Sequence, residues 1–123
     1  MIKQSKQVLI AEDDTFLTNI MGKVFKQHGI RVVLVNNGQE ALEALKREVP
    51  DVLLLDLLMP VLDGFGVMKA MKEKHVQCPI VVVSNVGDKV TRDKCKAFHV
   101  KAYLVKSDMD DDALWPAIEK YLK

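Results

Sequence analysis

The chain has 123 residues, of which 49% are hydrophobic, and this is enough for one domain with a core of ordinary size. A formal net charge of +1 gives no overall field that would draw the protein to nucleic acid or to an anionic membrane. The two cysteines cannot form a disulfide framework, and the first apolar run is too short for a signal peptide or membrane span, so we expect a cytoplasmic protein.

Five short apolar runs predict buried strands. Each is rich in leucine or β-branched residues and is bounded by polar or turn residues. The predicted strands are 8–11, 32–35, 52–55, 80–83 and 103–105. Amphipathic stretches separate them, and this alternation indicates a parallel α/β sheet with helices on both faces.

The first two predicted helices have recognisable ends. Apolar residues recur at three- and four-residue spacing from Leu17 to Phe25, and Gly29 follows where a left-handed cap is favoured. Asn37, with Glu40 three residues later, resembles the capping arrangement that begins a helix. The second helix is predicted to end before residues 49–50, where proline follows valine.

The third and fourth helices are predicted from a weaker pattern. The third begins after Asp63-Gly64, and its buried side chains are predicted to be Phe65, Val67, Met68 and Met71. The fourth covers about 89–98 and is more polar, with a thin apolar stripe. We therefore expect the fourth helix to contribute little to the core.

An acidic cluster from Asp108 to Asp112 predicts the start of the fifth helix, which continues to Leu122. Pro116 limits where this helix can begin. If Asp112 is the cap, the proline falls in the first turn, where its missing amide hydrogen costs no helical hydrogen bond. If Asp110 is the cap, one helical hydrogen bond is lost. The sequence favours the start at Asp112.

Reactive side chains follow four of the predicted strands. These residues are Glu12, Asp13 and Asp14 after the first strand, Asp56 after the third, Ser84 after the fourth and Lys106 after the fifth. Ligands of open parallel sheets bind beyond the carboxyl ends of the strands, so we expect these groups to share one edge. Each residue alone could be a helix cap, a turn residue or a solvated charge.

Taken together, the groups favour phosphoryl transfer. Several converging carboxylates repel one another unless a cation lies among them, and oxygen ligands favour a hard metal such as Mg2+. A lysine can bind a phosphoryl oxygen, a hydroxyl can donate to one, and a carboxylate can act as the nucleophile by forming an acyl phosphate.

Four segments resemble the receiver domain of two-component response regulators, and the resemblance covers essentially the whole chain. They are VLIAEDD at 8–14, DVLLLDLLMP at 51–60 with Asp63-Gly64, PIVVVS at 79–84 and YLVK at 103–106. The resemblance implies a flavodoxin-like, doubly wound sheet of five parallel strands in the order 2-1-3-4-5, with five helices. It also implies one CheY-like receiver domain over 1–123, and the sequence leads us to expect no output domain.

The resemblance assigns the residues of a phosphorylation site. Asp56 is the expected phosphoacceptor. Asp13 is an expected direct ligand of Mg2+, Glu12 a ligand acting through water, and the backbone carbonyl of Leu58 a further ligand. Asp56 itself also binds the metal, and Lys106 neutralises charge on the phosphoryl group.

The resemblance also implies a switch and its partners. The Ser84 hydroxyl is expected to move toward the phosphoryl group, leaving space for Tyr103 to swing in from solvent. A sensor histidine kinase or histidine phosphotransfer protein would supply the phosphoryl group. The fourth helix, fifth strand and fifth helix would then bind a downstream protein, with no direct nucleic-acid contact, no membrane insertion and no enzymatic activity beyond the protein's own phosphorylation and slow dephosphorylation.

Several positions depart from the family pattern, among them Ser84, where threonine is commoner. Lys106-Ser107 replaces the usual Lys-Pro pair, so a phosphorylation-independent binding module is the alternative function. His99 stands where a glycine usually ends the fourth helix, and that turn must be built differently or accept strain. Leu58 and Val86 are apolar where side chains of this family influence attack by water, so we expect slow self-dephosphorylation. Leu58 also occupies the place of the second acid of an aspartyl phosphohydrolase, which disfavours that class.

Overall fold

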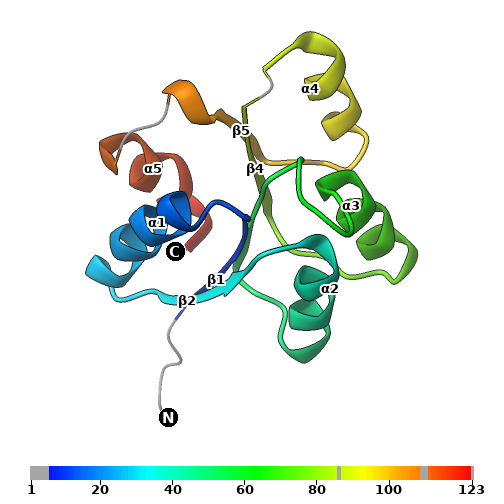
Figure 1. Cartoon of the computed structure of the whole chain (residues 1–123). Coiled ribbons are helices and arrows are strands. Elements are labelled where there is room, and N and C mark those ends of the chain that lie inside the picture. Colours follow the sequence, from blue (N-terminus) through cyan, green and yellow to red (C-terminus); the bar gives the residue numbers. More distant parts are fainter. Residues whose placement is uncertain (1–5, 86, 109–110, 123) are drawn as a thin grey trace.

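The five predicted strands form one parallel sheet in the computed structural model, which describes residues 6–85, 87–108 and 111–122. Their order is β2-β1-β3-β4-β5, which confirms the flavodoxin-like topology (Figure 1). The strands are β1 (Gln7–Ala11), β2 (Arg31–Val35), β3 (Val52–Leu55), β4 (Ile80–Ser84) and β5 (Ala102–Val105). Each observed strand contains the predicted one and differs from it by at most one residue at either end.

Five helices cover the two faces of this sheet. They are α1 (Thr15–Gln27), α2 (Gly38–Arg47), α3 (Gly64–Glu73), α4 (Lys89–Lys96) and α5 (Asp111–Ile118), with 3-10 turns η1 (Lys106–Asp108) and η2 (Glu119–Leu122). Figure 1 shows α1 and α5 on one face and α2, α3 and α4 on the other. None of these helices combines the length and the apolar character needed to cross a bilayer.

The central strands are buried on both faces, and their side chains alternate between two hydrophobic clusters. Leu53 and Leu55 of β3 belong to the cluster under α2 and α3, whereas Val52 and Leu54 belong to the cluster under α1 and α5. Phe25 of α1 is fully buried in the second cluster and makes an edge contact with Trp115 of α5. The core therefore holds the strands, and with them the loops at their carboxyl ends, in fixed positions.

Four helices begin at a side-chain cap. Asp14 accepts a hydrogen bond from the Leu17 amide at 3.2 Å, and Asn37 accepts one from the Glu40 amide at 2.8 Å, which confirms the predicted cap of α2. The equivalent caps of α3 and α4 are Asp63 and Asp88. Each cap satisfies an amide at a helix start, and each lies within a loop at the carboxyl edge of the sheet.

Left-handed residues follow three helices: Gly29 after α1, His75 after α3 and His99 after α4. Gly29 has a φ of 72° after α1, as predicted. His99 has a φ of 58°, so the turn that follows α4 places a non-glycine residue in a conformation that favours glycine. The turn accepts the expected strain, and α4 itself ends at Lys96, two residues before the predicted end.

The predicted start of the fifth helix is wrong. α5 begins at Asp111, so Asp112 lies within the helix and cannot be its cap, and Pro116 lies in the helix interior. Because proline has no amide hydrogen, the helix lacks the bond that residue 116 would donate to the Asp112 carbonyl. The other candidate cap, Asp110, lies outside the described residues.

One prediction about α3 is also only partly right. Val67, Met68 and Met71 are buried as expected, but Phe65 is only partly buried at the margin of the cluster. Phe65 is the second residue of the helix, where the chain leaves the loop, so its ring covers the edge of the core and does not enter it.

Two buried glycines are expected to respond to alanine in opposite directions. A Cβ at Gly38 would overlap the carbonyl group of Leu62, so Gly38→Ala should lower the free energy of unfolding by about 1–3 kcal/mol. A Cβ at Gly22 in α1 would meet nothing within 4 Å, so Gly22→Ala should raise it by roughly 0.5–1 kcal/mol. Chemical denaturation of both variants measures this, and equal shifts would contradict the close approach of α2 to Leu62.

Candidate functional site

Three carboxylates meet at the carboxyl edge of the sheet because β1 and β3 are neighbours in register. Ala11 pairs with Leu55, so Glu12 and Asp56 leave the sheet side by side, and the Asp56 amide donates to the Ala11 carbonyl at 3.0 Å. One carboxylate oxygen each of Glu12, Asp13 and Asp56 lies within 4.8 Å of the others. Residues 44 positions apart in the sequence are therefore joined by strand pairing alone.

Two of these carboxylates are buried and held by backbone amides. Glu12 and Asp56 are 2% and 4% exposed, whereas Asp13 faces solvent. The Asp14 amide donates to Glu12 Oε2 at 3.1 Å, and the Leu58 amide donates to Asp56 Oδ1 at 3.2 Å. These bonds fix the direction of each carboxylate and partly offset the loss of water.

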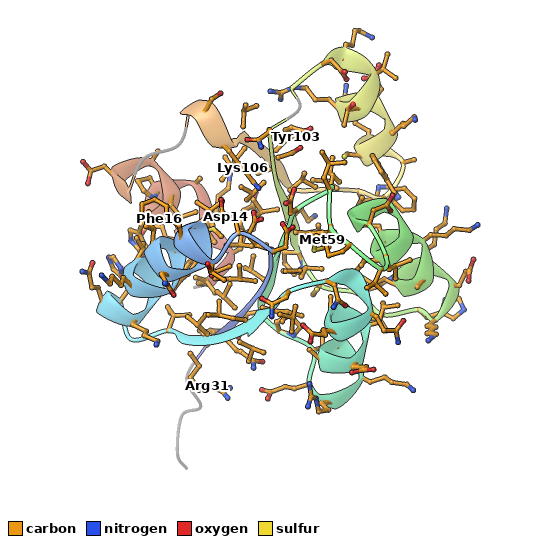
Figure 2. The ribbon with its side chains drawn as sticks, in the orientation of Figure 1. Asp14, Phe16, Arg31, Met59, Tyr103 and Lys106 are labelled. Carbon is orange, nitrogen blue, oxygen red and sulfur yellow. The ribbon has the colours of Figure 1, made fainter. Side chains whose placement is uncertain are left out.

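Lys106 supplies the positive charge of the site. It is the first residue of η1, directly after β5, and its side chain reaches toward β3 and β1. Its Nζ lies 2.7 Å from Glu12 Oε1 and 3.0 Å from Asp56 Oδ2. Figure 2 shows Lys106 and Tyr103 at β5, with Asp14 and Met59 on the loops that follow β1 and β3.

The pKa values of Glu12 and Lys106 reflect their burial and their charged neighbours. Burial raises the pKa of Glu12 to about 7. The hydrogen bond from Lys106 opposes this rise, and the negative charge of the neighbouring Asp56 adds to it. Burial would lower the pKa of Lys106, but its hydrogen bonds to Glu12 and Asp56 raise it above its usual value. One ammonium therefore does not neutralise three carboxylates, and a small divalent cation with oxygen ligands fits the chemistry of this donor set.

Gly64 determines how closely α3 approaches the phosphoacceptor candidate. A Cβ at this position would lie 2.5 Å from the Asp56 carbonyl oxygen and 2.8 Å from Leu57 Cα. The Gly64 amide donates to the Leu57 carbonyl at 2.9 Å, while Asp63 caps the helix. The glycine of the Asp63-Gly64 pair is therefore required by the close packing of α3 against residues 56 and 57. The sequence analysis missed this requirement, although a glycine at the start of a helix was a visible signal.

Ser84 and Tyr103 lie next to each other on β4 and β5. Ser84 is fully buried at the end of β4, where it pairs with Val105, and Tyr103 pairs with Val82 two residues earlier. The Tyr103 ring is already partly buried, and burial raises the pKa of its phenol, while the neighbouring Ser84 side chain opposes this rise. Arg92 of α4, which sequence reasoning did not connect with Tyr103, places its guanidinium carbon 4.6 Å from the ring centre.

The other predicted site groups remain predictions. The Leu58 amide faces Asp56, and the proposed role of the Leu58 carbonyl as a metal ligand is untested. The Leu58 side chain is 63% exposed and lies two residues beyond Asp56. Val86 lies outside the described residues.

Residues 8–119 match the sequence profile of the family described as the response regulator receiver domain. A probable transcriptional regulator, ycf27 of Guillardia theta, is 32% identical over 105 residues, which are 85% of this chain and 41% of that protein. A protein-glutamate methylesterase/protein-glutamine glutaminase of Treponema denticola is 35% identical over 92 residues, covering 71% of this chain and 25% of that protein. The chain thus spans less than half the length of these relatives.

Solved structures share the same fold. The BeF3-activated receiver domain of Klebsiella pneumoniae RstA superposes with a TM-score of 0.86 at 23% identity, covering 96% of this chain and 99% of that one. Chemotaxis protein CheY4 of Vibrio cholerae superposes with a TM-score of 0.86 at 24% identity, covering 97% and 100%. The receiver domain of a Pseudomonas aeruginosa sensor histidine kinase, with a magnesium ion in its active-site cleft, gives 0.84 at 22% identity, covering 97% and 98%.

Proposed function

Because the chain belongs to the response-regulator receiver family of two-component signalling, we propose that it is a switch that accepts a phosphoryl group on Asp56. One observation carries this proposal. The buried Asp56 carboxylate lies 3.0 Å from the Lys106 ammonium and within 4.8 Å of the carboxylates of Glu12 and Asp13. A nucleophile, a counter-charge and a set of hard ligands therefore share one edge of the sheet.

Glu12, Asp13 and Asp56 are the residues that would hold Mg2+, together with the Leu58 carbonyl. When bound, Mg2+ would neutralise charge on the carboxylates and on the incoming phosphoryl oxygens. The fit rests on the oxygen-only donor set of three carboxylates that lie within 4.8 Å of one another. Asp13 faces solvent and offers the most accessible of the three carboxylates.

Asp56 would act as the nucleophile. One carboxylate oxygen forms a bond to phosphorus while the bond between phosphorus and the donor nitrogen breaks, and the donor histidine keeps that electron pair. The Leu58 amide holds Oδ1, and Lys106 is paired with Oδ2. As the acyl phosphate forms, Lys106 would move from the carboxylate to a phosphoryl oxygen and remain paired with Glu12.

Receiver domains of this family work with histidine kinases and downstream effectors, so a sensor histidine kinase or a histidine phosphotransfer protein is the proposed donor. The downstream partner would bind the surface formed by α4, β5 and α5. The transcriptional and methylesterase activities named for the longer relatives belong to those proteins, whose length this chain covers only in part.

The second candidate is a binding module that works without phosphorylation. It is favoured by one observation, the serine at position 107 after Lys106 where the family usually has proline. Against it stands the position of Lys106, whose ammonium still meets both Glu12 and Asp56. We therefore propose the phosphorylated switch.

The test is incubation with Mg2+ and a small phosphodonor such as acetyl phosphate, followed by measurement of the intact mass. The wild-type protein should gain one phosphoryl group, and Asp56→Asn should gain none, since an amide cannot form the acyl phosphate. Asp51→Asn is the matched control, because Asp51 lies at the opposite end of β3 and should leave modification unchanged.

Removal of Mg2+ with a chelator should also prevent the mass increase. An unmodified wild-type mass with several donors would favour the binding module. Equal modification of wild type and Asp56→Asn would show that the phosphoryl group lies on another residue.

A further inference from the structure

The Tyr103 ring has a different neighbour on each side. Toward the sheet, Tyr103 pairs with Val82 of β4, two residues before the buried Ser84. On its outer side lies Arg92 of α4, with the guanidinium carbon 4.6 Å from the ring centre. Figure 2 shows Tyr103 on the side of β5 toward α4.

Arg92 is itself anchored at a second point. Its Nε donates to the carbonyl oxygen of Gly87 at 3.0 Å, and Gly87 belongs to the loop between β4 and α4. A Cβ at Gly87 would lie 3.1 Å from Val105 of β5 and 3.7 Å from Arg92, so the loop, the arginine and β5 are closely packed. One side chain thus joins the loop that follows Ser84 to the ring of Tyr103.

Arginine suits this position better than another cation. The planar guanidinium can stack on an aromatic ring while one of its N–H groups donates to a carbonyl in a fixed direction. A lysine ammonium retains the charge but has no planar surface and no comparable fixed geometry. The main chain of Arg92 is also fixed, because its amide donates to the Asp88 carbonyl in the first turn of α4.

We infer that Arg92 is a positioning residue that holds Tyr103 in its inward orientation and couples the ring to the loop between β4 and α4. The inference rests on the proposed function, in which Ser84 turns toward the phosphoryl group. When Ser84 turns, the contact with Arg92 continues to restrain the ring. A displacement of the Gly87 loop is then transmitted through Arg92 to Tyr103 on the proposed partner surface.

The test follows the ring directly. The protein has two tyrosines, Tyr103 and Tyr121, so fluorotyrosine labelling gives two fluorine NMR signals that Tyr121→Phe assigns. Arg92→Gln should increase the population of the solvent-exposed Tyr103 ring about two- to fivefold, the effect expected for one cation–π contact at an exposed site. The solvent isotope shift of the signal measures this population, and Arg92→Lys should restore part of the inward population.

The controls separate this effect from a general loosening of α4. Lys96→Ala removes another exposed cation of α4, one that is paired with Asp93 at 3.4 Å, and it should leave the Tyr103 signal unchanged. The Tyr121 signal is an internal reference and should not move in any Arg92 variant. The inference is overturned if Arg92→Gln leaves the Tyr103 signal as in the wild type, or if Lys96→Ala shifts it equally.

A separate measurement keeps this inference distinct from the proposed function. Intact mass after treatment with Mg2+ and acetyl phosphate should show equal modification of the wild type and Arg92→Gln, because the contacts of Arg92 are to Tyr103 and Gly87. If neither protein is modified, the phosphorylated switch fails, while the fluorine signals still decide the position of the ring. If only Arg92→Gln fails to react, Arg92 acts at the phosphorylation site and the positioning role is wrong.

Discussion

Replacing Lys106 with methionine is expected to slow the phosphorylation of Asp56 by about two to three orders of magnitude, the usual effect of losing one preorganised charge in a buried site. Lys106 Nζ lies 3.0 Å from Asp56 Oδ2, so it can follow the charge that moves onto the phosphoryl oxygens. Methionine keeps an unbranched side chain of similar length and removes the ammonium. The rate of mass increase with acetyl phosphate and Mg2+ measures the loss.

The same substitution should strengthen the binding of Mg2+. Without Lys106, the carboxylates of Glu12 and Asp56 lose the cation that now lies 2.7 Å and 3.0 Å from them, so the site becomes more negative. Titration calorimetry should therefore find tighter Mg2+ binding together with slower phosphorylation. This opposite movement distinguishes a loss of charge from a general loss of structure, which would weaken both.

The control for Lys106→Met is Lys101→Met. Lys101 is an exposed lysine that precedes β5, at the amino end of the strand that Lys106 follows. Its removal changes the net charge by the same amount and should leave both measurements near the wild-type values. A Lys106→Met protein that is phosphorylated at the wild-type rate would remove Lys106 from the proposed mechanism.

The double substitution Leu58→Asn with Val86→Glu is expected to speed the loss of the phosphoryl group by about a hundredfold, the lower end of the contribution of a positioned acid–base group. Leu58 lies two residues beyond Asp56, its amide donates to Asp56 Oδ1, and its side chain is 63% exposed. An apolar side chain there can shield the acyl phosphate and cannot orient a water molecule. Decay of the phosphorylated mass after removal of the donor measures the rate.

Val61→Asn is the control for this pair. Val61 lies on the same loop and is 80% exposed, and its φ of 69° is one that asparagine accepts more easily than valine. It adds an amide to the loop three residues beyond Leu58. If the double variant decays no faster than Val61→Asn, the apolar flanks do not explain a slow decay.

The sequence contained most of the fold because the apolar runs and the helix caps are local signals. Asn37 and Gly29 have the cap conformations predicted from their residue types. The predicted start of α5 was wrong. Pro116 favoured a late start, because the proline would then lie in the first turn of the helix. The helix instead begins at Asp111 and contains the proline.

The candidate site was predictable for a different reason. Residues that follow parallel strands share one edge, so Glu12, Asp56 and Lys106 could be grouped without knowing any side-chain position. The contacts that depend on exact packing could not be read in this way. The approach of Gly64 to the Asp56 carbonyl depends on how α3 packs against the sheet, and the position of Arg92 on the Tyr103 ring depends on how α4 packs.

The sparse packing of α4 has a consequence for local stability. Cys95 is the one buried side chain of this helix, whereas α1 buries five residues. Helices with little buried apolar surface open at a lower free energy than the rest of a domain. In hydrogen–deuterium exchange, the amides of α4 should therefore exchange through local unfolding, well before those of β1 and β3. A partner protein that binds α4 would then stabilise this helix more than any other part of the domain.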